Sequence, residues 1–197
     1  MSLDETLQRL QATAWDHAAS LPDAGALGNE HLSGWIEVAQ AARPLLADLE
    51  RPEVMQSLNQ AVAAIPARPA QRATADSTLH QLATAMRDLH TQLPQDDASR
   101  QNAGDVVAVV IQSTARVSAS RAHASSNPQV RAVARELDLT ASRAHSAVND
   151  SHAQTVTLLG SSRETPTATA KTAATTQQRR LHDPTPSTSP QAPSRRM

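Results

Sequence analysis

The chain has 197 residues, no cysteine and a formal net charge of -1, which fits one domain plus a tail better than two full domains. The lack of cysteine excludes disulfides, thiolate nucleophiles and most structural zinc sites. No apolar run approaches the ~18 residues that a membrane span needs, and the acidic residues Asp4 and Glu5 stand where a signal peptide carries positive charge. We therefore expect a cytoplasmic protein that does not enter a membrane.

Large aromatic side chains are nearly absent, since there is no Phe or Tyr and the two tryptophans are Trp15 and Trp35. Any core must be built from Leu, Val and Ala. Alanine is abundant and Lys171 is the one lysine among many arginines, a bias that GC-rich codons produce and that indicates a high-GC bacterium. The same bias weakens any argument that arginine was selected for bidentate phosphate contacts.

The first helix is predicted from residue 3 to about Pro22. Residues 2–5 have the form of a capping box, and apolar residues then recur at spacings of three and four. A second helix is capped by Asn29, with Trp35 or Ile36 on its apolar stripe. The two tryptophans are predicted to fill the gap between these helices.

Proline positions divide the next part of the chain. Pro44 lacks an N–H and clashes one turn back, so we expect a kink or break between Gln40 and Pro44. Pro52 suits the first turn of a third helix, which Pro66 ends. Residues 66–69 then read as a linker.

The second half of the chain contains the clearest helical pattern, since apolar residues alternate at four and three from position 75 to 93. Asp96 or Asp97 is expected to cap the next helix, which runs toward position 125. Its valine-rich run 106–111 also reads as a strand, but the sequence offers no second strand to pair with it. Asn127 and Pro128 begin a last helix to about 160, antiparallel to the one before.

These patterns predict an all-α fold, an antiparallel helical bundle of about five to six helices over residues 1–160. A boundary that would divide this bundle into two parts is predicted at 66–72 or at 94–97. Residues 161–197 are read as a disordered Ser/Thr/Pro/Arg-rich tail, because they hold almost nothing to bury. The residues expected to be buried are Leu7, Leu10, Leu32, Leu79, Leu82, Met86, Leu89, Val110 and Leu137.

Formal charge is distributed unevenly along the chain. Residues 1–97 carry a net charge of -7, residues 98–160 carry +2, and residues 161–197 carry +4. The basic half invites a nucleic-acid interpretation, because clustered arginines neutralise phosphates without reading sequence. The candidate nucleic-acid contacts are Arg116, Arg121, Arg131, Arg135 and Arg143.

The residues that could carry catalysis or bind metal form no recognised motif. No histidines stand at the i, i+4 spacing of a helical zinc site. His145 and His152 lie two turns apart with Asp150 nearby and could supply two ligands of a metal site that another helix completes. Without a nucleophile elbow or a glycine-rich phosphate loop, we expect no enzyme, no catalytic residue, no cofactor, no bound metal and no small-molecule ligand.

Two functions from different classes remain open. The first is a non-enzymatic helical interaction or adaptor protein with a protein partner, or a homo-oligomer, because a chain with so few aromatics buries little on its own. The alternative is a nucleic-acid-associated accessory protein of a plasmid or phage in a high-GC host, which would bind through the 98–160 hairpin and the tail.

Overall fold

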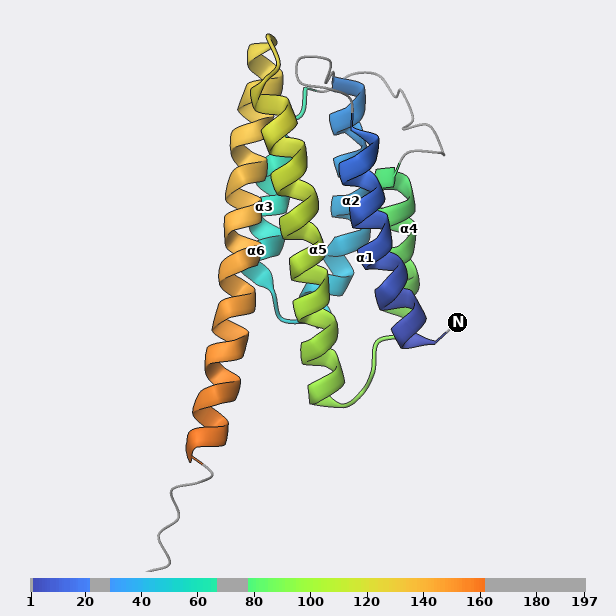
Figure 1. The fold of residues 1–197 in the computed structure, drawn as a ribbon, viewed down its shortest axis with the longest axis vertical. Helices are drawn as coiled ribbons and strands as arrows, with labels where there is room; N and C mark the ends of the chain where they lie inside the picture. Colours follow the sequence, from blue (N-terminus) through green and yellow to red (C-terminus); the bar gives the residue numbers. More distant parts are fainter. Residues whose placement is uncertain (1, 22–28, 67–77, 162–197) are drawn as a thin grey trace, which may run out of the picture. The chain divides into compact units, whose positions relative to one another are not determined.

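The computed structural model describes residues 2–21, 29–66 and 78–161, and residues 162–197 of the predicted tail lie outside them. Within these ranges the chain forms six α-helices and no strand (Figure 1), so the all-α prediction is confirmed. The valine-rich run 106–111 is helical, because it has no strand to pair with. The helices are α1 (Leu3–Ser20), α2 (Asn29–Asp48), α3 (Pro52–Ala63), α4 (Thr78–Thr91), α5 (Asp97–His123) and α6 (Pro128–Ser161).

Side chains that the sequence marks as caps begin several of these helices. The Ser2 hydroxyl accepts from the Glu5 N–H at 3.2 Å, and the Glu5 carboxylate accepts from the Ser2 N–H at 2.7 Å, which completes the predicted capping box. Asp96 caps α5 by accepting from the Ser99 N–H at 2.8 Å, a hydrogen bond that lowers the pKa of Asp96. Asn127 accepts from the N–H of residue 129 at 2.9 Å before α6.

The main contacts between helices close into a ring. Helix α1 contacts α4 and α5, α2 contacts α3 and α4, and α6 contacts α3 and α5. The order around the ring is therefore α1, α5, α6, α3, α2, α4. Figure 1 shows α5 between α1 and α6, with α1 and α5 running in the same direction. The predicted α5–α6 hairpin is confirmed, and it turns through residues 124–127.

The core is made of leucine, valine and alanine, as the composition requires. All nine residues predicted to be buried are buried. Small side chains bring the helices close together: five alanines of α5 are fully buried, and a Cβ built on Gly34 of α2 would lie 2.8 Å from Leu79 of α4. The α2–α4 contact therefore depends on a glycine.

The expected break at Pro44 is wrong, because α2 runs through it from Asn29 to Asp48. Proline removes the hydrogen bond that the carbonyl of Gln40 would accept. Both residues are exposed, so water can satisfy that carbonyl. Four neighbouring side chains on the other face are buried, namely Ala41, Ala42, Leu45 and Leu46, and burying them offsets the ~3 kcal/mol cost of a proline inside a helix.

The prediction that both tryptophans fill a gap between α1 and α2 is half wrong. Trp35 is fully buried, but Trp15 is 78% exposed. On α1 the buried stripe contains Leu7, Leu10 and Ala14, and the residue after Ala14 points about 100° away from it. Trp15 is thus the most exposed large apolar side chain in the part of the chain that the structure describes.

Leu82 of α4 is fully buried in the core, so we expect Leu82→Ala to lower the free energy of unfolding by about 2 to 5 kcal/mol, through lost transfer energy and a residual cavity. Urea denaturation monitored by circular dichroism measures this. Leu139→Ala is the matched control, because Leu139 is 52% exposed and should lose less than about 1 kcal/mol. Equal losses in both variants would show that α4 does not lie in the core.

Candidate functional site

A buried polar cluster lies where α1, α2, α4 and α5 meet. The two ring nitrogens of His17 contact the Thr78 hydroxyl at 2.8 Å and the Ser118 hydroxyl at 2.9 Å, and the Trp35 indole N–H donates to the same Ser118 oxygen at 3.2 Å. His17 is only 2% exposed. Burial, followed by the nearby charge of His31, lowers the pKa of His17 to about 4.

This cluster suits a structural role. In a neutral imidazole one nitrogen donates and the other accepts, so the two hydroxyls saturate His17. A general base must reach the proton that it abstracts, but His17 has both nitrogens occupied and almost no exposed surface. His17 therefore connects α1 to α4 and α5 through its neutral ring.

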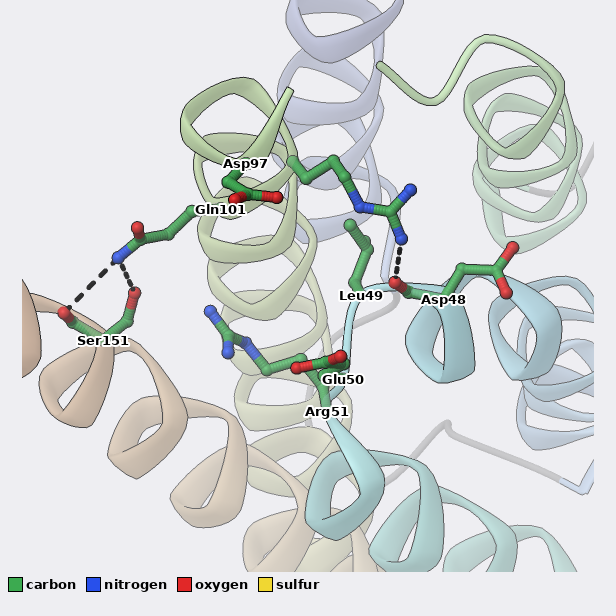
Figure 2. A pocket seen from close by; sticks show the side chains of 8 residues that line it. Asp48, Leu49, Glu50, Arg51, Asp97, Gln101 and Ser151 are labelled. Atoms are coloured by element: carbon green, nitrogen blue, oxygen red, sulfur yellow. Dashed lines mark hydrogen bonds between the residues drawn. The ribbon is translucent and has the colours of Figure 1, made fainter. Parts of the chain in front are cut away.

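A polar pocket of ≈ 380 Å³ lies where the α2–α3 turn meets the start of α5 and the second half of α6 (Figure 2). Arg51 donates to Asp105 at 2.9 Å, and Asp105 also accepts from the Ser151 hydroxyl at 3.2 Å. Gln101 donates to that hydroxyl at 2.9 Å. Arg100 donates to the carbonyl oxygen of Asp48. These bonds hold the ring closed at this end of the bundle.

The pocket holds several charged groups that are already paired within the protein. The Arg51 guanidinium packs against Gly104, where a Cβ would lie 3.4 Å from its Nη2 atom. The Asp48 carboxylate contacts His90 Nε2 at 2.9 Å. This arrangement is that of a structural junction between helices.

Glu50, on the rim of this pocket, is the one non-glycine residue with positive φ in the described ranges, at φ 54°. The Glu50 N–H donates to the carbonyl of Ala47 at 3.1 Å, and the Arg51 N–H donates to that of Leu46 at 2.9 Å. This is the Schellman arrangement, in which the left-handed position usually holds glycine. The side chain therefore strains the end of α2.

The five candidate arginines do not form one surface. Arg131 donates to the carbonyl oxygens of Ser125 and Ser126 at 2.9 and 3.1 Å and so ties down the turn before α6. Arg143 lies on the side of α6 that faces α3, 3.7 Å from Glu53.

The other three candidates, Arg116, Arg121 and Arg135, make no ion pair within the described ranges. Helical spacing places Arg116 and Arg121 on different sides of α5, about 140° apart. The structure therefore leaves three separate arginines available to solvent and uses the other two within the fold.

The two histidines considered as metal ligands have protein partners. His145 contacts Gln112 of α5 at 3.3 Å and Asn149 of its own helix at 3.2 Å. His152 lies 3.8 Å from Asp105. Across the described part of the chain, no three His, Asp or Glu side chains are grouped so that they could hold a metal ion.

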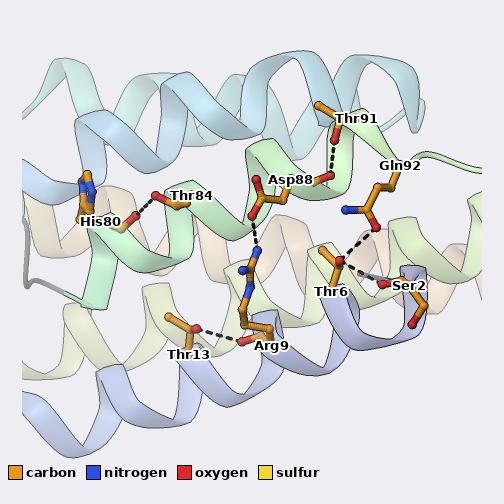
Figure 3. A network of polar contacts seen from close by, with 9 residues as sticks. All are labelled: Ser2, Thr6, Arg9, Thr13, His80, Thr84, Asp88, Thr91 and Gln92. Carbon is orange, nitrogen blue, oxygen red and sulfur yellow. Dashed lines mark hydrogen bonds and ion pairs between the residues drawn. The ribbon is translucent and has the colours of Figure 1, made fainter.

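Polar contacts between α1 and α4 fix which side of α1 faces outward (Figure 3). Arg9 pairs with Asp88, and the Thr6 hydroxyl donates to Gln92 at 3.2 Å. Because Thr6 contacts the end of α4 and His17 contacts its start, the two helices are antiparallel. With α4 on one flank and α5 on the other, Trp15 points to solvent.

Around Trp15 lies an uncharged surface that sequence reasoning missed, which we call the Trp15 face. It is made of the outward residues of two adjacent helices, all exposed or half-buried. Asp16 and Arg116 border it. The position of Trp15 off the apolar stripe of α1 was the signal that could have revealed this face. Its residues are Gln8, Gln11, Ala12, Trp15 and Ala19 of α1 and Val106, Val109, Ser113, Val117 and Ser120 of α5.

Helix α5 is apolar on more than one side. Val107 and Val110 are buried in the core, whereas Val109 is 43% exposed, with Val106 and Val117 half-buried beside it. Helix α5 therefore carries valines on its outer side as well as in the core, beside the exposed polar residues Ser113, Arg116 and Ser120.

No family model, curated protein or solved structure matches this chain. Among the described helices, none combines the length and apolar character required to cross a membrane.

We expect acid to destabilise the protein through His17. Its pKa is about 4 when folded and 6.5 in the unfolded reference, so the unfolded state binds more protons between these values. The contribution of neutral His17 to the free energy of unfolding is therefore fully present above pH ~6.5 and is lost as the pH drops toward 4. Urea titrations should show wild type losing about 3 kcal/mol more than His17→Gln from pH 7 to pH 4.

Leu139→Gln is the control for this titration, because Leu139 is 52% exposed and has no titratable group, and it should keep the wild-type pH dependence. If His17→Gln does not fold, NMR titration of the wild-type ring replaces it, and the ring should stay neutral at pH 5. A ring that titrates at its ordinary value would contradict the buried neutral state.

Glu50→Gly should raise the free energy of unfolding by about 0.5 to 1 kcal/mol, since glycine removes the left-handed strain but adds unfolded-state entropy. Glu50→Ala keeps the Cβ and should give no comparable gain. Thermal and urea denaturation of both variants measure the difference. An unchanged or reduced stability in Glu50→Gly would show that the Glu50 side chain contributes more than its strain costs.

Proposed function

We propose that this protein is a non-enzymatic helical interaction protein that binds an uncharged, largely apolar protein surface through the Trp15 face. The observation that carries the proposal is the 78% exposure of Trp15 in a chain with only two aromatic residues. Tryptophan is among the residues that contribute most energy at protein interfaces, particularly near their centre.

The composition of the face supports this role. Interface centres are depleted in charge and surrounded by a polar rim, and the Trp15 face has uncharged residues within and Asp16 and Arg116 at its edges. The other exposed large apolar residues, Ile36 and Leu139, lie on α2 and α6 outside this face. Trp15 and Val109 thus share a surface that two adjacent helices form.

The nucleic-acid alternative has weaker support in the arrangement of its residues. Arg131 and Arg143 are engaged with other groups of the protein, and the other three candidate arginines are separate from one another. The same hairpin also carries the carboxylate of Asp138, which contacts His123 at 2.6 Å. The part of this proposal that involves the tail concerns residues outside the described ranges. Binding to duplex DNA is therefore treated as an outcome of the test below.

The test uses the immobilised full chain to capture proteins from a nuclease-treated extract of its source cells, with quantitative mass spectrometry as the readout. Wild type should retain a partner that Trp15→Glu loses by about tenfold or more, because an exposed aromatic anchor contributes about 2 kcal/mol or more. Leu139→Glu is the matched control, since it changes an exposed apolar residue outside the face, and it should retain the partner.

Equal retention by wild type and Trp15→Glu would contradict the proposal. A parallel titration with duplex DNA tests the alternative. Affinity that falls with salt at a slope of about -0.9 per neutralised phosphate, and that Arg116→Ala, Arg121→Ala and Arg135→Ala reduce together, would favour nucleic-acid binding instead.

A further inference from the structure

We propose that the partner at the Trp15 face is a second copy of this chain, related by a two-fold axis that sets α1 against α1 and α5 against α5 in antiparallel pairs. This inference rests on the proposed function and names the occupant of the same face. It is carried by the absence of charge within the face, by the register of α1 and α5, and by the charged residues at its two ends.

An uncharged face is suited to contact with itself. A two-fold interface places the same patch on both subunits, so any charge near its centre meets a like charge. Between residues 8 and 19 of α1 and 106 and 120 of α5, the outward positions of the face hold only Gln, Ala, Trp, Val and Ser. Glutamine amides both donate and accept, so the Gln11 amide can pair with Gln11 of a second copy.

The spacing of the outward residues is that of helix-to-helix packing. On α1 they follow at positions 8, 11, 15 and 19, and on α5 at 106, 109, 113, 117 and 120, at intervals of three and four like those that form a seam between helices. Trp15 has Ala12 one turn before it and Ala19 one turn after it. A large side chain flanked by small ones can insert beside the small residues of an antiparallel copy.

The register of the two helices fixes where the axis lies. His17 of α1 contacts Ser118 of α5 at 2.9 Å, and the helices run in the same direction (Figure 1), so Ala12 is level with Ser113. A two-fold axis that lies in the plane of the interface at that level, perpendicular to α1 and α5, places Ala12 against Ala12 and Ser113 against Ser113 of the second copy. It also places Val109 opposite Val117, so exposed valines cover one another.

The ends of the face select the antiparallel arrangement. Exposed Asp4 begins the outward stripe of α1, and half-buried Arg121 follows Val117 by one turn at the other end of α5. The proposed axis brings Asp4 of each copy near Arg121 of the other. A parallel arrangement would bring Asp4 near Asp4 and Arg121 near Arg121, and like charges in contact oppose association.

The size of the face indicates a weak dimer. It extends about 16 Å along α1 and about 21 Å along α5, with the two axes about 8 to 10 Å apart. Such a surface falls at the low end of specific protein interfaces. We expect a dissociation constant in the micromolar range.

Sedimentation equilibrium of the full chain from about 1 to 100 µM tests the proposal. Wild type should dimerise, and Trp15→Glu should remain monomeric with an unchanged circular dichroism spectrum. Asp4→Lys and Arg121→Glu should each weaken dimerisation by about threefold to tenfold, and the double variant should recover wild-type affinity within about twofold. Arg135→Glu, which changes an exposed arginine of α6 outside the face, should leave the dimer intact.

A dimer that Trp15→Glu leaves intact, or single charge variants that the double variant does not rescue, would overturn this arrangement. A wild-type chain that stays monomeric at all these concentrations would also overturn it. In that case, partner capture that still depends on Trp15 leaves the proposed function standing, whereas capture independent of Trp15 removes both proposals.

Discussion

The close approach of helices through small side chains is the constraint on which this fold depends. With no Phe or Tyr to span a gap, opposing helices must come near enough for Leu, Val and Ala to meet. At the α2–α4 contact the approach is close enough that a Cβ on Gly34 would lie 2.8 Å from Leu79. On α5 the buried alanines allow α6 to pack closely along its length. This dense packing supplies the dispersion energy that large aromatic side chains would otherwise give.

Polar side chains specify the arrangement that such uniform apolar surfaces would leave ambiguous. Alanine faces resemble one another and pack in several registers with similar energy, but a buried polar group is satisfied in one register only. His17, Trp35 and Ser118 meet from three helices in the core, and Arg51, Asp105 and Ser151 meet from three segments at one end. A slip of one turn would leave each of these groups without its partner.

The sequence predicts most of the helices because the apolar stripes and caps are local signals. Leu82 and Met86 lie on a regular stripe, and the Ser2 cap needs only residues within one turn. Pro44 shows where local reasoning fails, because the packing that keeps α2 continuous comes from other helices. The contact of Trp35 with Ser118 was beyond prediction for the same reason: residues 83 positions apart become neighbours only through the order of the ring.

The order of the ring also governs how the chain can assemble. Of its main helix pairs, α2 with α3 and α5 with α6 are adjacent in sequence, whereas α1 with α4, α1 with α5, α2 with α4 and α3 with α6 are distant. The adjacent pairs close short loops, but the distant pairs carry a larger entropic cost of loop closure. Neither α1–α3 nor α4–α6 contains a closed set of contacts, so each half leaves apolar faces that only the other half covers. The two halves therefore relate as complementing fragments, which would associate with each other even if the chain between them were cut.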